Sequence, residues 1–226
     1  MQIIWRSRRG TKSVTNNDAA AVRLDGEYAL AIVVDASAQG RGQAFAQHWA
    51  SSVVVSNGDV ALPKDVAALK EAIRLQQRQL RDQHFVTEKA SYCCALVDLR
   101  RRQVDILHTG DCRLAVQAAS GDVTWLTQPH TLDRQLQLLG VAETPRSRHL
   151  RTRCLSPRRH QEPELLSFPL AQEDRLILCT DGYWYENFAS VGTQGEDGDD
   201  ASVLTLQTGQ PSQDIQSDCE NIFLSS

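Results

Sequence analysis

Five aspartates stand where apolar stretches of the sequence end or begin. Asp35 follows Ala-Ile-Val-Val, Asp181 follows Leu-Ile-Leu-Cys-Thr, Asp111 follows an alternating apolar run, and Asp199-Asp200 precedes Ala-Ser-Val-Leu. Strands of one sheet end at common edges, so these carboxylates can converge in space. Crowded carboxylates repel one another unless a cation lies among them, and hard divalent cations prefer oxygen ligands. The pattern favours a carboxylate-rich metal site, although an aspartate after a strand is also a common turn residue.

Other enzyme signatures are missing from the sequence. It contains no G-x-S-x-G nucleophile motif, no phosphate-binding G-x-x-x-x-G-K-[ST] loop, no G-x-G-x-x-G fingerprint and no H-E-x-x-H pair. The six cysteines form no C-x-x-C pair, and no Cys/His spacing suits zinc. These absences shift weight toward metal chemistry with oxygen ligands.

The elements that must position the aspartates are mostly strands, interrupted by two helical blocks. Phe45, Trp49 and Val53 recur at helical spacing within residues 43–55, and a second apolar stripe follows Pro63 through about residue 83. Short links between the later apolar runs indicate antiparallel neighbours. The sequence therefore predicts an α+β fold with strands at 3–6, 28–34, 91–99, 103–108, 113–118, 123–126, 175–180 and 201–207.

Length, charge and hydropathy exclude several classes of protein. The chain has 226 residues, with 24 Lys and Arg against 28 Asp and Glu, so no basic field exists to hold nucleic acid. The longest apolar stretch, residues 29–34, is too short to cross a membrane, and the N-terminal residues do not resemble a signal peptide. We therefore expect a cytoplasmic protein with neither a nucleic-acid nor a membrane partner. A single domain is expected over residues 1–208, followed by a polar C-terminal tail or edge appendage at 209–226.

Six segments, in order, carry a resemblance to a known family. They read NNDA at 16–19, VVDA at 33–36, HTGDCR at 108–113, LTQPH at 126–130, DRLILCTDGYW at 174–184 and DDASV at 199–203. They resemble the N-E-D-A, V-A-D-G, N-x-G-D-S-R, L-T-x-D-H, D-x-L-L-L-C-S-D-G-L-W and D-N-x-[ST]-V motifs of the metal-dependent Ser/Thr protein phosphatases of type 2C. The resemblance covers roughly residues 8–207 and is closest to the compact bacterial members.

The resemblance implies a fold, a reaction and a setting. The implied fold is an α-β-β-α sandwich in which two antiparallel sheets lie between helix pairs, reduced in the C-terminal third because the chain between Trp184 and Asp199 is short. The implied reaction is hydrolysis of phosphoserine and phosphothreonine by a hydroxide that bridges two Mg or Mn ions, with a third metal position nearby. The implied setting is bacterial signalling, with a phosphoprotein substrate, a cognate Ser/Thr kinase and a monomeric enzyme.

The resemblance also assigns roles residue by residue. Asp35 and Asp181 would act in catalysis through metal-bound water. The metal positions would be Asp35, the backbone carbonyl of Ala36, Asp181 and Asp199, with Asp111 at the third-metal position and Asp18 behind the direct ligands. For substrate binding, the basic residues near the motifs are Lys12, Arg9, Arg151 and Arg153, the last two from an Arg-rich segment at 146–160 that contains no acid.

Several positions depart from the family pattern. Ser13 stands where the family has a phosphate-binding arginine, Asn17 replaces the glutamate of N-E-D, and the turn after Asp35 lacks the expected histidine. Such losses weaken charge neutralisation and leaving-group protonation while leaving the metal carboxylates in place. Two interpretations therefore stay open: an enzyme with impaired activity, or a catalytically weak phosphatase-fold module that binds a phosphoprotein or regulates a partner.

Overall fold

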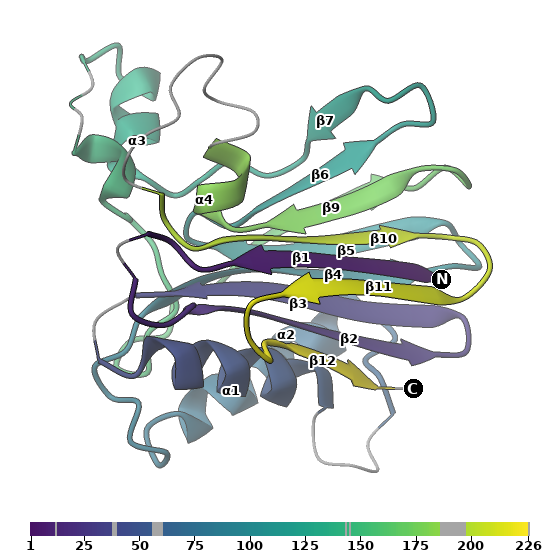
Figure 1. Ribbon diagram of the computed structural model, residues 1–226, viewed down its shortest axis with the longest axis horizontal. Coiled ribbons are helices and arrows are strands. Elements are labelled where there is room, and N and C mark those ends of the chain that lie inside the picture. The colour runs from purple at the N-terminus through teal and green to yellow at the C-terminus, as the bar shows by residue number, and fades with distance from the viewer. Residues whose placement is uncertain are drawn as a thin grey trace.

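Two six-stranded β-sheets lie face to face in this protein (Figure 1). The computed structural model describes residues 1–11, 13–37, 40–55, 61–142, 144, 146–185 and 198–225. The first sheet has the strand order β11 (Ser212–Ser217), β1 (Gln2–Arg8), β10 (Ala201–Gln207), β9 (Arg175–Cys179), β6 (Arg113–Gln117) and β7 (Val123–Trp125). The second has the order β12 (Ile222–Ser225), β2 (Asp18–Asp25), β3 (Tyr28–Ala36), β4 (Ala90–Asp98), β5 (Gln103–Thr109) and β8 (Glu164–Pro169).

The central strands of the second sheet are buried on both faces, which explains their continuous apolar sequence. In β3, Ala31 and Val33 face the first sheet, whereas Ile32 and Val34 face the helices, as the two-residue period of a strand requires. Both sets are fully buried. The stretch that the sequence marks as its longest apolar run is thus the middle of the sandwich.

Helices α1 (Gly42–Val55) and α2 (Val66–Gln79) cover the outer face of the second sheet (Figure 1). Phe45, Trp49 and Val53 of α1 are buried against that sheet, as their spacing predicts. Asp65 caps α2, because its side chain accepts a hydrogen bond from the Ala68 amide at 2.8 Å. Shorter helical segments are α3 (Leu132–Leu138), α4 (Asp181–Trp184) and the 3-10 turn η1 (Ser147–His149).

The predicted sandwich fold is confirmed, with one correction to its strand directions. Each sheet is mixed rather than purely antiparallel, because β11 runs parallel to β1 and β12 runs parallel to β2. Both added strands come from the C-terminal segment and close one edge of each sheet. Asn221 ties them down: its buried side chain accepts from the Trp5 indole at 3.0 Å and donates to Ser7 Oγ and the Asp18 carbonyl.

The outer face of the first sheet carries a small apolar cluster in which Tyr183 and Trp184 of α4 pack on Ile177, Cys179 and Val203. Residues 186–197, on which the prediction of a reduced C-terminal third rests, lie outside the described residues. Within the described ranges, no helix combines the length and the apolar character needed to cross a membrane.

Candidate active site

Three aspartates from three different strand ends meet at one edge of the sandwich. Asp35 lies near the end of β3, Asp111 follows β5, and Asp181 follows β9 as the first residue of α4. One carboxylate oxygen from each lies within 4.8 Å of the others. Asp35 belongs to the second sheet and Asp181 follows a strand of the first, so packing of the two sheets creates the cluster.

Asp18 lies beside this cluster as the cross-strand neighbour of Asp35. Its side chain is 1% exposed, and its Oδ2 accepts a hydrogen bond from Thr180 Oγ1 at 3.0 Å. Its Oδ1 is buried and meets no donor among the described residues. A buried carboxylate oxygen without a partner is costly, so this atom marks a place where a cation fits.

Local structure fixes Asp111 in its position. The Ser91 hydroxyl donates to Asp111 Oδ1, and Ser91 Oγ in turn accepts from the Asp111 backbone amide at 3.1 Å. Gly110 has a φ of 88°, and a Cβ there would lie 2.0 Å from Ser91 Oγ. The glycine is therefore required both by its backbone conformation and by this close approach.

Arg151 inserts its guanidinium into the carboxylate cluster. Its Nη2 donates to Asp35 Oδ2 at 2.8 Å and its Nε donates to Asp111 Oδ2 at 2.9 Å. The three side chains are 21%, 11% and 2% exposed, respectively, so these ion pairs are largely withdrawn from solvent. The sequence predicts Arg151 as a substrate-binding residue; the structure places it directly on two of the predicted metal carboxylates.

Even with this arginine, burial and mutual repulsion make it costly for all the carboxylates to be ionised. Burial raises the pKa of Asp35, as do the nearby Asp181 and Asp18 carboxylates, while Arg151 lowers it less than these together raise it. Burial and the neighbouring Asp111 carboxylate raise the pKa of Asp181 to about 8. The raised pKa values, the orphaned Asp18 oxygen and the all-oxygen donor set fit Mg²⁺ or Mn²⁺, which carry more charge than a guanidinium.

Asp199 and its neighbour Asp200 take different positions. Asp199 is exposed and lies outside the cluster of converging oxygens, although it is close enough to contribute to the raised pKa of Asp181. Asp200 is 5% exposed and accepts hydrogen bonds from the Gly10 amide at 2.7 Å and the Asn17 amide at 2.8 Å. The Asn17 side chain adds a third bond to Asp200 at 2.9 Å. Asp200 therefore anchors the residues after β1 at this edge.

Arg9 and Arg153, two of the other predicted substrate-binding residues, bond to backbone carbonyls. Arg9 is exposed and donates to the Val14 carbonyl at 2.9 Å. Arg153 donates to the Glu162 carbonyl. Lys12 lies outside the described residues. Ala36, whose carbonyl is a predicted ligand, ends β3 directly after Asp35.

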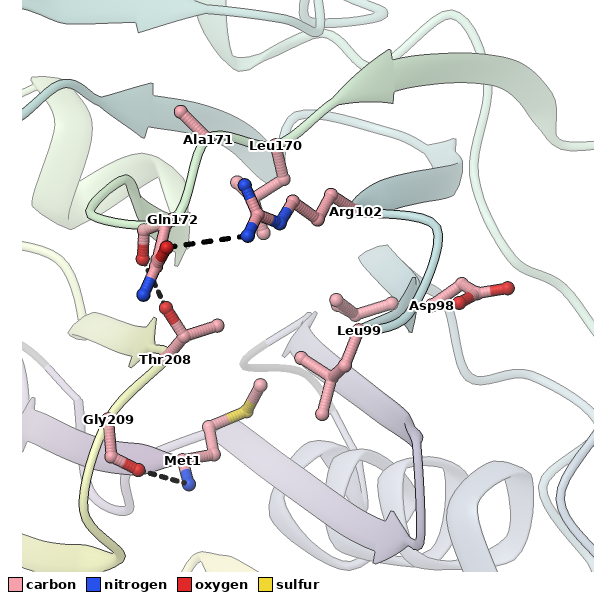
Figure 2. Close-up of a pocket in the computed structure, with 10 residues that line it drawn as sticks. Met1, Asp98, Leu99, Arg102, Leu170, Ala171, Gln172, Thr208 and Gly209 are labelled. Atoms are coloured by element: carbon pink, nitrogen blue, oxygen red, sulfur yellow. Dashed lines mark hydrogen bonds between the residues drawn. The ribbon is translucent and has the colours of Figure 1, made fainter.

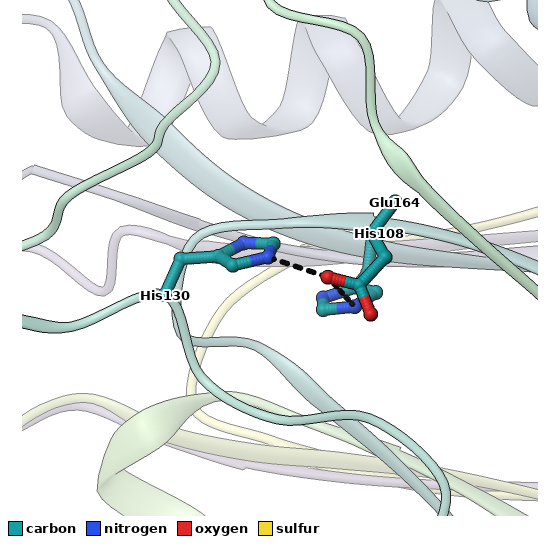
Figure 3. A group of neighbouring side chains, drawn as sticks. All are labelled: His108, His130 and Glu164. Atoms are coloured by element: carbon teal, nitrogen blue, oxygen red, sulfur yellow. Dashed lines mark hydrogen bonds and ion pairs between the residues drawn. The ribbon is translucent and has the colours of Figure 1, made fainter. Parts of the chain in front are cut away.

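A second group of potential metal ligands consists of His108, His130 and Glu164 (Figure 3). The two histidines belong to the quoted segments 108–113 and 126–130, whereas Glu164 belongs to none, and no sequence pattern predicts that the three meet. The two imidazole rings stack with centroids 4.7 Å apart and an interplanar angle of 3°. The Gly110 amide donates to Nδ1 of His130 at 3.1 Å, which leaves Nε2 as the protonated nitrogen facing Glu164 Oε2 at 3.0 Å. A metal-bound imidazole donates through its other nitrogen. The group is thus built as a hydrogen-bonded support for Gly110 rather than as a metal centre.

Two cavities lie at opposite ends of the strands. One, of about 310 Å³, is lined by residues such as Met1, Leu99 and Thr208 (Figure 2), and lies at the opposite strand ends from Asp35, Asp111 and Asp181. The other, of about 350 Å³, is lined by Ser37, Gly40, Thr87, Glu88 and Lys89. Ser37 comes two residues after Asp35, so the second cavity lies on the side of the sandwich where the three aspartates converge.

Comparison with known proteins relates the chain to solved structures. No family model matches it, and no curated protein matches its sequence. The S. agalactiae serine/threonine phosphatase matches with a TM-score of 0.76 at 14% identity, covering 92% of this chain and 99% of that one. Staphylococcus aureus Stp1 matches with a TM-score of 0.76 at 18% identity (92% and 94% covered). The catalytic domain of PstP, solved with two manganese ions, matches with a TM-score of 0.68 at 21% identity (90% and 96% covered). The chain therefore has the fold of the bacterial serine/threonine phosphatases.

Proposed function

We propose that this protein is a metal-dependent phosphatase that hydrolyses phosphoserine and phosphothreonine in proteins. The observation that carries the proposal is the convergence of carboxylate oxygens from Asp35, Asp111 and Asp181 at one edge of this fold. That edge is formed by residues of the segments that resemble the type 2C motifs. Similar structures are serine/threonine phosphatases, and one of them holds two manganese ions.

The residues that would hold two Mg²⁺ or Mn²⁺ ions are Asp35, the Ala36 carbonyl, Asp181 and Asp199, with Asp111 at a third position. When bound, the ions would lower the pKa of water and neutralise charge on the phosphoryl group. The chain's own residues orient these ligands. Thr180 holds the Asp18 carboxylate beside Asp35, and Ser91 holds Asp111.

We assign phosphate recognition to the four basic residues that the sequence predicts for it. Arginine binds phosphate through two parallel hydrogen bonds, and Arg151 contacts Asp35 and Asp111 directly. Lys12, Arg9 and Arg153 complete the proposed set. We further propose a monomeric enzyme that opposes a Ser/Thr kinase in the cytoplasm of a bacterium.

The test measures phosphate release from a phosphothreonine peptide and from an aryl phosphate, with and without Mn²⁺. We expect turnover that requires Mn²⁺ and falls by about a hundredfold or more in Asp181→Asn. The matched control is Asp82→Asn, an exposed aspartate in the turn after α2, which should retain full turnover. Equal activity in both variants would contradict the site assignment.

A second candidate function is a phosphatase-fold module that binds a phosphoprotein without turning it over. The observation that favours it is the occupation of Asp35 and Asp111 by Arg151, together with Ser13 and Asn17 at departing positions. In that case wild-type protein shows no phosphate release at saturating Mn²⁺, yet it binds the phosphopeptide more tightly than the unphosphorylated peptide. Calorimetry with both peptides separates the two functions.

A further inference from the structure

The position of Arg151 is set by the fold and not by the reach of a flexible surface side chain. Its backbone forms an antiparallel bridge with Thr131 at the start of α3. The flanking residues extend this bridge, because Leu132 N–H donates to the Leu150 carbonyl and Thr152 N–H donates to the His130 carbonyl, both at 2.8 Å. These backbone contacts thus place the Arg151 guanidinium beside the carboxylates of Asp35 and Asp111.

The guanidinium uses the same atoms that a metal ion needs. Nη2 and Nε each lie on the Oδ2 oxygen of one aspartate, Asp35 and Asp111 respectively. A divalent ion bound at about 2.0–2.6 Å from those oxygens would lie against the guanidinium. Two cations in contact repel strongly where solvent is largely excluded.

We propose that Arg151 competes with divalent cations for Asp35 and Asp111, so that a divalent ion binds these carboxylates only when the guanidinium leaves them. The inference rests on the proposed function, because it concerns the same metal site. It adds a regulatory step: the Arg-rich segment sets the metal concentration at which the site loads. A partner or phosphate that draws Arg151 away from the aspartates promotes metal binding. Bound metal in turn strengthens the binding of that partner or phosphate by the same factor.

The first test compares Mn²⁺ affinity by calorimetry in wild type and Arg151→Ala. Removing the competing guanidinium should tighten Mn²⁺ binding by about tenfold or more, since two charge-assisted contacts no longer have to break. Arg151→Ala should also melt at a lower temperature than wild type without metal and regain the difference in saturating Mn²⁺. The matched control is Arg158→Ala, which removes an equal charge from the same segment at a residue that contacts the Val86 carbonyl; its Mn²⁺ affinity should stay at the wild-type value.

The second test needs no variant to fold. In wild-type protein, the ¹⁵N resonance of Arg151 Nε is followed during titration with diamagnetic Mg²⁺, and should shift with the same midpoint as Mg²⁺ binding. An unchanged resonance at saturation would overturn the proposal, as would unchanged, weaker or absent Mn²⁺ binding in folded Arg151→Ala.

These outcomes are separable from the proposed function. Competition between Arg151 and Mn²⁺ without any phosphate release refutes the phosphatase and leaves the present inference standing. Mn²⁺-dependent phosphate release with unchanged affinity in Arg151→Ala does the reverse.

Discussion

The buried His108 makes the stability of the protein sensitive to mild acid. Its side chain is fully buried, and its Nε2 faces Glu164 Oε2 at 3.7 Å, which is longer than a hydrogen bond. Burial, reinforced by the neighbouring His130, lowers the pKa of His108 from 6.5 to about 4, against the opposing effect of Glu164. The folded state therefore takes up this proton at lower pH than the unfolded state, whose histidine titrates near 6.5.

The sign and size of the effect follow from proton linkage. Well above pH 6.5 the imidazole is neutral in both states and contributes nothing to the pH dependence. As the pH falls below 6.5, the unfolded state binds a proton that the folded state does not bind until the pH nears 4, so the free energy of unfolding decreases. Each pH unit removes at most about 1.4 kcal/mol, which gives about 2 kcal/mol between pH 7 and pH 5.

The measurement is urea denaturation of wild type and His108→Phe at several pH values between 7 and 5. Phenylalanine keeps a ring stacked on His130 and cannot titrate, so the difference between the two curves reports His108 together with its electrostatic coupling to His130 and Glu164. The wild-type free energy of unfolding should fall by about 2 kcal/mol more than that of His108→Phe. His84→Asn, at an exposed histidine with a φ of 63°, is the control and should follow wild type. Parallel curves for wild type and His108→Phe would refute the reasoning.

Three further changes test the supports of the site by urea denaturation at pH 7. Gly110→Ala should cost about 2–4 kcal/mol, because of its positive φ and the contact with Ser91; a neutral effect would show that the turn relaxes freely. Asn221→Ala should cost about 3 kcal/mol by leaving buried partners on β1 and β2 unpaired, and wild-type stability would mean that the C-terminal strands do not depend on it. Asn17→Asp should cost about 2–4 kcal/mol by setting a carboxylate against Asp200, whereas Asn17→Ala loses the side-chain hydrogen bonds to Asp200 and Thr15 without adding a charge and should cost less.

The Asn17 interaction also bears on the departure from the type 2C pattern. The sequence shows only that an amide stands where the family has a carboxylate. In the structure that amide donates to the buried Asp200, while the adjacent backbone amide does the same. A glutamate at this position would meet Asp200 with like charge, so the departure suits its neighbour in this chain.

Local sequence patterns determined much of the framework. Apolar runs such as 28–34 and 175–180 predict β3 and β9, because a strand that is buried on one or both faces has apolar residues in a recognisable pattern. The spacing of apolar residues after Gln43 predicts α1 in the same way. An aspartate that directly follows such a run is therefore predicted to lie at the end of a strand, as Asp35 and Asp181 do.

Other strands left little trace in the sequence. β11 reads SQDIQS and is mostly exposed, and it pairs with β1 through backbone hydrogen bonds that side-chain polarity does not encode. β8 follows the Arg-rich stretch and alternates only between half-buried and exposed residues. An edge strand forms where a neighbouring strand offers unpaired backbone N–H and C=O groups, and it does not require an apolar sequence. Only the assembled sheets therefore show where these segments lie.

The sequence by itself determined which residue types could form an acidic site and on which strands they lie, because those features are local. Tertiary structure decided the partners: Arg151 on Asp35 and Asp111, His108 stacked on His130, and the buried role of Asp200 beside the exposed Asp199. Each of these depends on the packing of segments far apart in the chain. The sequence shows which side chains can carry a charge, but which residues these side chains contact follows only from how the two sheets pack together.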